Sequence, residues 1–345
     1  MTNYLTTITT GLAAVKVHSA TSYSWFGQRN PPLPKAIRAV IDEEAAREYL
    51  LHGLHRQLYH HLYCTGAAMP ARNVDVGKRS SMCSAFVAEL SAANAGSGAR
   101  EAGWRVHAID QDRIVVERHG LHLWVKPDQV CLTNGSHPEV GLPVSIRLPN
   151  ELLKRSPGYY IALGNEEMGP RGTDPVIRVY WNLTANAAPH LIKSMTTRLN
   201  TARIPFRLKV INDPERYTRC DAAVLYVPKR WYPRVAEIVA AIHEELATLL
   251  LAATPAFTKP LAPGLALAED PGTSESFGMH RCRLFAEAII NAHDEGRRSV
   301  EERLESVIAS FVTAGVSCEQ PFLNSGSTDT YPVISDAKAA GAVME

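Results

Sequence analysis

Ile177-Arg178-Val179-Tyr180-Trp181-Asn182-Leu183 is the stretch that decides the fold, because its apolar and polar side chains alternate strictly. Side chains of a β-strand point to opposite faces in turn, so a strand here has one apolar face. The other face carries Arg178, Tyr180 and Asn182. One face of this strand is therefore expected to lie on a core, and the other to carry polar chemistry.

The next alternating stretch, Phe206–Ile211, repeats the pattern, with Arg207 and Lys209 opposite the apolar side chains. Arg and Lys can hold a phosphate dianion, and a Lys among other cations has a lowered pKa that lets it act as a base. Polar sheet faces that meet water are equally ordinary. The pattern alone leaves both interpretations open: a solvated sheet surface and a catalytic floor.

More basic residues flank these strands. Arg219 precedes the predicted strand Ala222–Val227, which contains Tyr226, and Lys229 and Arg230 follow it. His280, Arg281 and Arg283 open a predicted helix, whose free N–H groups can bind an anion. Lys229 and Arg230 are interpreted as solvated loop charges. Arg219 and Arg281 are interpreted as functional.

Outward from these strands, the pattern predicts an α+β fold with a mainly antiparallel sheet and flanking helices. The expected divisions are a helical N-terminal region (1–100), a β-rich region (101–165) and an α+β domain (166–330). The tail after Cys318 is expected to be loose. Helices are expected at 41–63, 81–93, 188–200, 235–252, 279–293 and 300–314, a β-meander at 104–109, 113–117 and 121–125, further strands at 142–148 and 159–163, and a loop at 264–278.

Composition excludes several classes of protein. The 345 residues are 46% apolar, and 36 Lys and Arg balance 35 Asp and Glu, so a nucleic-acid partner is not expected. No run reaches the ~18 apolar residues of a membrane span, and the six cysteines form no C-x-x-C pair, which favours a cytoplasmic protein with reduced thiols. Glu48, His52 and His55 share a helical stripe but lack a ligand from a second segment, so no metal is expected.

Several segments together resemble the HopA effector family of plant-pathogen type III secretion, over most of the chain from about Ser81 onward. More closely, the chain looks like actinobacterial relatives from biosynthetic clusters for ribosomally made peptides, the thioamitides and class V lanthipeptides. The segments that carry the resemblance are Leu90–Asn94, Leu121–Val125, Ser145–Pro149, Arg178–Leu183, Asp221–Tyr226 and Ser276–Arg283.

The resemblance implies that a separate kinase, similar to aminoglycoside phosphotransferases, phosphorylates Ser or Thr of a precursor peptide. The HopA-like protein then eliminates phosphate, which leaves dehydroalanine or dehydrobutyrine and requires no cofactor or metal. A more distant resemblance, to phosphothreonine lyase effectors and lanthipeptide synthetase lyase domains, places Lys209 as the base and Tyr180 where a general-acid His stands. His280 is the alternative acid. The phosphate ligands implied are Arg178, Arg207, Arg219, Arg281 and Arg283, with Asn182 and Tyr226 as further site residues.

Two rival functions remain open at this point. The first is a non-catalytic protein that binds the phosphopeptide or the leader peptide as partner of the kinase. The second is a host-directed effector with the same lyase chemistry.

Overall fold

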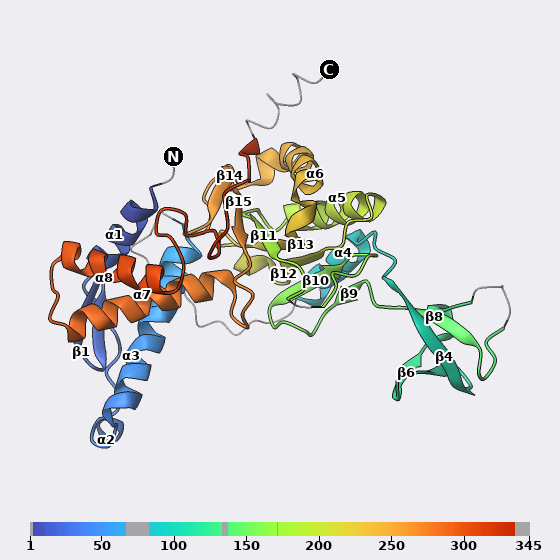
Figure 1. Cartoon of the computed structure of the whole chain (residues 1–345), viewed down its shortest axis with the longest axis horizontal. Coiled ribbons are helices and arrows are strands. Elements are labelled where there is room, and N and C mark those ends of the chain that lie inside the picture. The colour runs from blue at the N-terminus through green and yellow to red at the C-terminus, as the bar shows by residue number, and fades with distance from the viewer. Residues whose placement is uncertain (1–2, 67–82, 133–136, 171, 335–345) are drawn as a thin grey trace.

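A computed structural model describes residues 3–66, 83–132, 137–170 and 172–334. Over these residues the protein is a mixed α and β structure with antiparallel sheets, as predicted. Figure 1 shows a central sheet between a helical end, with α1, α3, α7 and α8, and a small sheet at the opposite end. The helices are α1 (Tyr4–Ala14), α2 (Lys35–Arg38), α3 (Glu43–Leu58), α4 (Ser84–Ala93), α5 (Ala187–Thr201), α6 (Tyr232–Leu246), α7 (Phe277–Asp294) and α8 (Val300–Thr313).

The central sheet has seven strands, and both strands from which the sequence analysis started are inside it. Each neighbouring pair is antiparallel. In spatial order the strands are β14 (Lys259–Ala262), β15 (Leu265–Glu269), β11 (Val176–Trp181), β13 (Ala223–Pro228), β12 (Arg207–Ile211), β10 (Tyr159–Leu163) and β9 (Glu151–Leu152).

The apolar face of this sheet is covered by helices. Trp181 lies against His243 of α6, and α5 packs beside α6, as Figure 1 shows. On the opposite face, the ring of Tyr180 contacts those of Tyr63 and Phe277. Phe277 is the first residue of α7, and Tyr63 is the last residue of the helical turn that follows α3. Thus α7 and the π-helical turn η1 (Tyr59–Tyr63), which continues α3, cover part of the polar face.

Two smaller sheets complete the fold. A three-stranded sheet follows α1, and a five-stranded sheet, which contains the predicted meander, has a hydrophobic cluster of its own around Trp104, Val116 and Ile146. The predicted meander strands are confirmed, whereas the proposed domain boundaries stay a prediction. The strands are β1 (Val15–Ser19), β2 (Ser22–Trp25) and β3 (Gln28–Arg29), then β4 (Arg100–Asp110), β5 (Arg113–Arg118), β6 (Leu121–Val125), β7 (Val130–Cys131) and β8 (Pro143–Arg147).

Several helix limits differ from the prediction. The helix predicted over 41–63 ends as α3 at Leu58 and continues as η1, and the one predicted to residue 252 ends at Leu246. The predicted start of α4, Ser81, lies outside the described residues. The remaining short helical turns are η2 (Pro127–Gln129), η3 (Pro214–Arg216), η4 (Lys229–Trp231) and η5 (Ala247–Leu249).

The loop predicted over 264–278 is wrong in its first part. Leu265–Glu269 is β15, buried along its whole length beside β11. A strand buried on both faces has no apolar–polar alternation, so the period-two pattern does not reveal it.

The loose tail predicted after Cys318 is also wrong over the described residues. Phe322, Leu323 and Tyr331 are buried. The backbone of Phe322 accepts a hydrogen bond from Glu269, and the Tyr331 hydroxyl donates to the Glu269 carboxylate at 2.7 Å. We call residues 321–331 the C-terminal strap.

Lys229 is not a solvated loop charge, as the sequence suggested. Its Nζ lies 2.6 Å from the carboxylate of Glu269, which is 2% exposed. Arg230 is more exposed and pairs with Asp174. Burial would raise the pKa of Glu269, but hydrogen bonds from Lys229, the Asn324 amide, Ser327 and Tyr331 lower it below its usual value.

Replacing Glu269 by Gln tests this network. The lowered pKa means that the carboxylate stabilises the fold above pH 4.5 and that this contribution is lost as the pH falls below it. Glu269→Gln is expected to reduce the free energy of unfolding by about 2 kcal/mol at pH 7, and by less under acid, in urea titrations. The exposed Glu167→Gln is the matched control. An equal loss at both pH values would contradict the assignment.

Candidate active site

The antiparallel register brings the predicted polar residues into two adjacent rows on one face of the sheet. Arg178 is opposite Tyr226, and Tyr226 is opposite Arg207. In the next row, Val224 lies between Tyr180 and Lys209. Side chains at directly opposed positions share a face, so these residues from β11, β13 and β12 form one surface.

Tyr226 lies between two guanidinium groups. The Arg178 carbon Cζ is 5.1 Å from the centre of the Tyr226 ring, and the Arg207 Cζ is 5.7 Å from it. Such cation–π contacts hold the two positive charges close together on one aromatic ring. Arg178 is buried, whereas Tyr226 and Arg207 are partly exposed.

Lys209 lies against an aromatic ring and has a lowered pKa. Its Nζ lies 3.8 Å from the centre of the Tyr159 ring, and it has no carboxylate partner within the described residues. Burial, and then the positive charges of Arg219, Arg178 and Arg207, lower the pKa of Lys209 to about 8, although Asp221 acts in the opposite direction. Part of the Lys209 population is therefore neutral near neutral pH.

Two aspartates hold two of the arginines. Asp270 Oδ2 accepts a hydrogen bond from Arg178 Nε at 2.7 Å and forms an ion pair with Nη2 at 2.6 Å. Asp221 accepts from Nε and Nη2 of Arg219 at 2.5 and 2.7 Å. Arg207 has no such partner among the residues that the structure describes. Its N–H donors are thus free to bind an anion.

Tyr180 is on the same face but is buried beneath Tyr63 and Phe277, with only 2% of its surface exposed. Its hydroxyl makes no hydrogen bond of normal geometry to a described residue. Burial raises the pKa of Tyr180 well above its usual value, so the hydroxyl keeps its proton.

Arg281, Arg283 and His280, at the start of α7, contact residues other than those around Lys209. Arg281 is buried and donates to the carbonyls of Pro321 and Leu323 in the C-terminal strap, and its Nη1 lies 2.7 Å from His280 Nδ1. Arg283 is paired with Glu275 and Glu287. Burial, Arg281 and Arg283 lower the pKa of His280. No contact places these three residues beside Lys209, where the sequence-based hypothesis expected at least Arg281.

The remaining predicted residue, Asn182, supports the sheet. Its side-chain amide donates to the carbonyl of Ala253 at 2.8 Å, and its backbone pairs with Gly264 and Leu251. It fixes the loop after β11 and is buried away from solvent.

The described residues contain no group of three His, Cys, Asp or Glu side chains placed to hold a metal ion. Of the histidine stripe on α3, His55 is hydrogen-bonded to the carbonyl of Met279 instead. Across the same part of the chain, no helix is long and apolar enough to cross a membrane.

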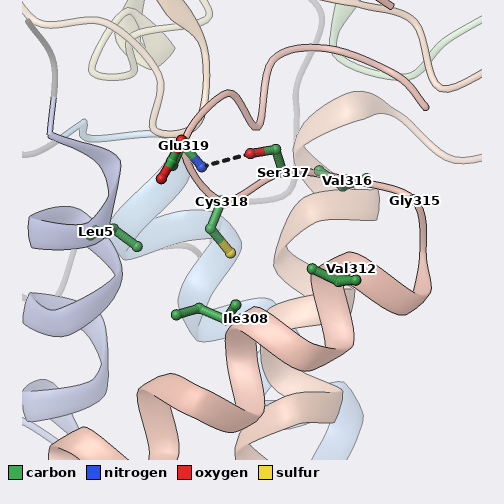
Figure 2. Close-up of a pocket in the computed structure, with 8 residues that line it drawn as sticks. All are labelled: Leu5, Ile308, Val312, Gly315, Val316, Ser317, Cys318 and Glu319. Atoms are coloured by element: carbon green, nitrogen blue, oxygen red, sulfur yellow. Dashed lines mark hydrogen bonds between the residues drawn. The ribbon is translucent and has the colours of Figure 1, made fainter. Parts of the chain in front are cut away.

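A hollow of about 370 Å³, shown in Figure 2, is separate from the basic sheet face and is lined by Leu5, Ile308, Val312, Gly315, Val316, Ser317, Cys318 and Glu319.

Four residues at the site were not predicted from the sequence: Tyr59, Tyr159, Asp221 and Asp270. Asp221 is inside a segment that carries the family resemblance and is two residues from Arg219. The sequence therefore contained a signal for an ion pair between the two side chains. Asp270 lies in the predicted loop, directly after β15. Tyr59 belongs to η1, far from the site in sequence, and no local pattern indicates it.

A family profile described as the HopA1 effector protein family matches residues 150–323, just over half of the chain. The chain belongs to that family. The matched segment contains the whole seven-stranded sheet and begins after the meander.

Among solved structures, the chain is similar to an effector protein from Pseudomonas syringae pv. tomato strain DC3000, with 16% identity and a TM-score of 0.43 over 81% of this chain and 97% of that one. An effector from Pseudomonas syringae pv. syringae strain 61 gives 16% identity and a TM-score of 0.37, over 48% of this chain and 63% of that chain. The search of curated proteins found no match.

The electrostatic coupling on the sheet face can be measured at Lys209. Arg207→Gln removes a neighbouring positive charge, so it is expected to raise the pKa of Lys209 above about 8. The measurement is the pH dependence of Lys209 acylation by an activated ester, read by peptide mass spectrometry. The exposed Lys193 in the same sample is the internal control. An unchanged Lys209 midpoint would show that Arg207 does not act on it.

Proposed function

We propose that this protein is a lyase that eliminates phosphate from phosphoserine or phosphothreonine in a peptide, leaving dehydroalanine or dehydrobutyrine. The observation that carries the proposal is Lys209, a partly buried amine with a pKa of about 8. It shares its sheet face with Arg178 and Arg207 and is close enough to Arg219 for that charge to lower its pKa. A base beside cationic donors is what β-elimination of phosphate requires.

In the proposed reaction, neutral Lys209 removes the proton from the substrate Cα and becomes an ammonium ion. The electron pair of the broken C–H bond forms the Cα=Cβ double bond. The bond between Cβ and the ester oxygen breaks, and its electrons leave with the phosphate. No water enters as a nucleophile, and the products are an alkene and inorganic phosphate.

The arginines would stabilise the charge that develops on the leaving phosphate. Arg178 and Arg219 are each balanced by an aspartate, so the positive charge still unbalanced on this face is that of Arg207 and the protonated fraction of Lys209. Such a surface fits an anion better than a neutral peptide side chain. Arg207, partly exposed on Tyr226, is the proposed principal phosphate ligand.

Tyr180 is the proposed donor of a proton to the leaving oxygen, because it shares the sheet face with Lys209 and its hydroxyl makes no hydrogen bond of normal geometry to a described residue. Its raised pKa makes it a weak acid, so the arginines would supply most of the stabilisation of the leaving group. His280 is the second candidate for the acid.

The peptide substrate, the kinase partner and the cellular location are also proposals. They follow from the resemblance described in the sequence analysis: a ribosomally made precursor peptide, a separate kinase similar to aminoglycoside phosphotransferases, and a cytoplasmic location. A host-directed effector with the same chemistry would use the same side chains, so genome neighbours would distinguish the two settings.

Substitution of Lys209 tests the chemistry directly. With kinase, nucleotide and precursor peptide present, Lys209→Ala is expected to leave phosphopeptide accumulating, with turnover reduced about 10²–10⁴-fold. Lys209→Arg is expected to fail as well, since a guanidinium stays protonated at working pH. Mass spectrometry follows the loss of phosphoric acid from the phosphopeptide.

The same pair of variants separates a lyase from a phosphopeptide-binding protein. A binder would tolerate Lys209→Arg, because the positive charge is kept. Normal elimination by Lys209→Arg would remove Lys209 from the role of base, and an inactive wild-type protein that still binds the phosphopeptide would favour the binder.

Arg207→Gln tests the phosphate ligand. It is expected to lower kcat/KM for the phosphopeptide about 10²-fold, because it removes the guanidinium that is not engaged by a carboxylate. Affinity for the unmodified peptide should stay the same, as measured by fluorescence anisotropy. Arg155→Gln, an exposed arginine outside the sheet, is the matched control. Equal losses for both peptides would argue against phosphate recognition by Arg207.

A further inference from the structure

One residue from the N-terminal part of the chain reaches the basic sheet face. The Tyr59 hydroxyl accepts a hydrogen bond of 2.9 Å from Nη2 of Arg219. The Tyr59 ring also lies 5.5 Å from the Arg219 Cζ. Tyr59 precedes the segment that the family profile matches, so this contact joins two separate parts of the sequence.

The local structure holds Tyr59 firmly in this place. It opens the π-helical turn η1, and its ring stacks on that of Tyr63 with centres 5.4 Å apart and planes at 15°. The end of this segment is joined to the sheet region by a backbone hydrogen bond of 2.7 Å from Cys220 to Cys64. Single π-helical turns inside helices are frequent at functional sites.

On the other side, α7 packs closely against Tyr63. A Cβ at Gly278 would collide with the Tyr63 ring, so only glycine allows this approach. The Tyr63 ring in turn meets Tyr180 edge to face. The stacked pair Tyr59 and Tyr63 is therefore fixed between α7 and the sheet.

We propose that Tyr59 is a positioning residue that, with Asp221, fixes the Arg219 guanidinium in the orientation in which it binds the substrate phosphate. This inference rests on the proposed function, since it concerns the same site.

The hydrogen bonds of Arg219 give the geometric reason. Asp221 engages Nε and Nη2, and Tyr59 engages Nη2 as well. The N–H groups of Nη1 have no partner within the described residues, so Nη1 is the edge left for a ligand. A guanidinium with its Nε and Nη2 donors already held loses less entropy when a phosphate binds at Nη1.

The chemistry of Tyr59 suits this role. Burial raises the pKa of Tyr59, despite the nearby charge of Arg219, so the hydroxyl stays neutral at working pH. It accepts from Arg219 without adding a second negative charge to that of Asp221. The hydrogen bond therefore orients the guanidinium without changing the net charge of the Arg219–Asp221 pair.

Tyr59→Phe removes only the oxygen and keeps the stacked ring. The measurement is the affinity for a phosphothreonine peptide and for its unmodified form, made in a Lys209→Ala background so that bound peptide is not converted. Tyr59→Phe is expected to weaken binding of the phosphopeptide about tenfold and to leave the unmodified peptide and the Tm unchanged. Tyr49→Phe, on α3 and away from the sheet, is the matched control.

A second background isolates the contact. With Arg219→Gln present, adding Tyr59→Phe should cause no further loss of phosphopeptide affinity, because the hydroxyl no longer has a guanidinium to orient. Equal weakening of both peptides, or an undiminished effect in the Arg219→Gln background, would overturn the positioning role.

The outcome can be separated from that of the proposed function. If the wild-type protein binds phosphopeptide selectively but never eliminates phosphate, the lyase proposal fails, and a loss of selectivity in Tyr59→Phe still supports the role of Tyr59. If elimination proceeds and Tyr59→Phe keeps full selectivity, the positioning role fails while the lyase proposal stands.

Discussion

The pairing of β11, β13 and β12 is the constraint on which the candidate site depends. In this register Arg178, Tyr226 and Arg207 form one row and Tyr180, Val224 and Lys209 the next. A shift of one residue in either pairing would turn a strand's polar side chains into the helix-covered core. Burial of the apolar face therefore selects the register that also brings the Arg and Lys side chains together. The fold and the candidate site depend on the same strand register.

Gathering positive charges on a partly buried surface costs free energy, and the two aspartates show how the fold reduces that cost. Arg178, which is buried, is paired with Asp270, and Arg219 is paired with Asp221. Arg207 and Lys209 are more exposed and have no described carboxylate partner. The uncompensated charge thus lies where solvent, or an anion, can reach it. The same arrangement lowers the pKa of Lys209, because Asp221 offsets only part of the effect of burial and of the arginines.

The sequence predicted the features that are local and periodic. The alternation of apolar and polar residues identified β11 and β12. It also placed Arg178, Tyr180, Arg207 and Lys209 on the polar faces of these two strands. It could not identify β15, since Leu265–Ala268 is apolar on both faces and resembles any short buried run. Tyr59 depends on a contact across 160 residues of sequence, which no spacing rule expresses. The basic side chains at 280–283 were expected near Lys209 because they are basic and belong to the family segment. Neither property determines which way a side chain points from its helix.

The surroundings of α7 suggest why Ser276–Arg283 carries so much of the family resemblance. Gly278 admits the Tyr63 ring, and Arg281 binds two carbonyls of the C-terminal strap. From the strap, Asn324 donates to the Asp270 carbonyl, and the Asp270 carboxylate holds Arg178. A chain of direct contacts therefore leads from α7 through the strap to a guanidinium on the sheet face. Arg281 is buried and donates to these two carbonyls, so it holds the strap against α7. The five N–H donors of a guanidinium suit this structural role, because they can serve several backbone carbonyls at once.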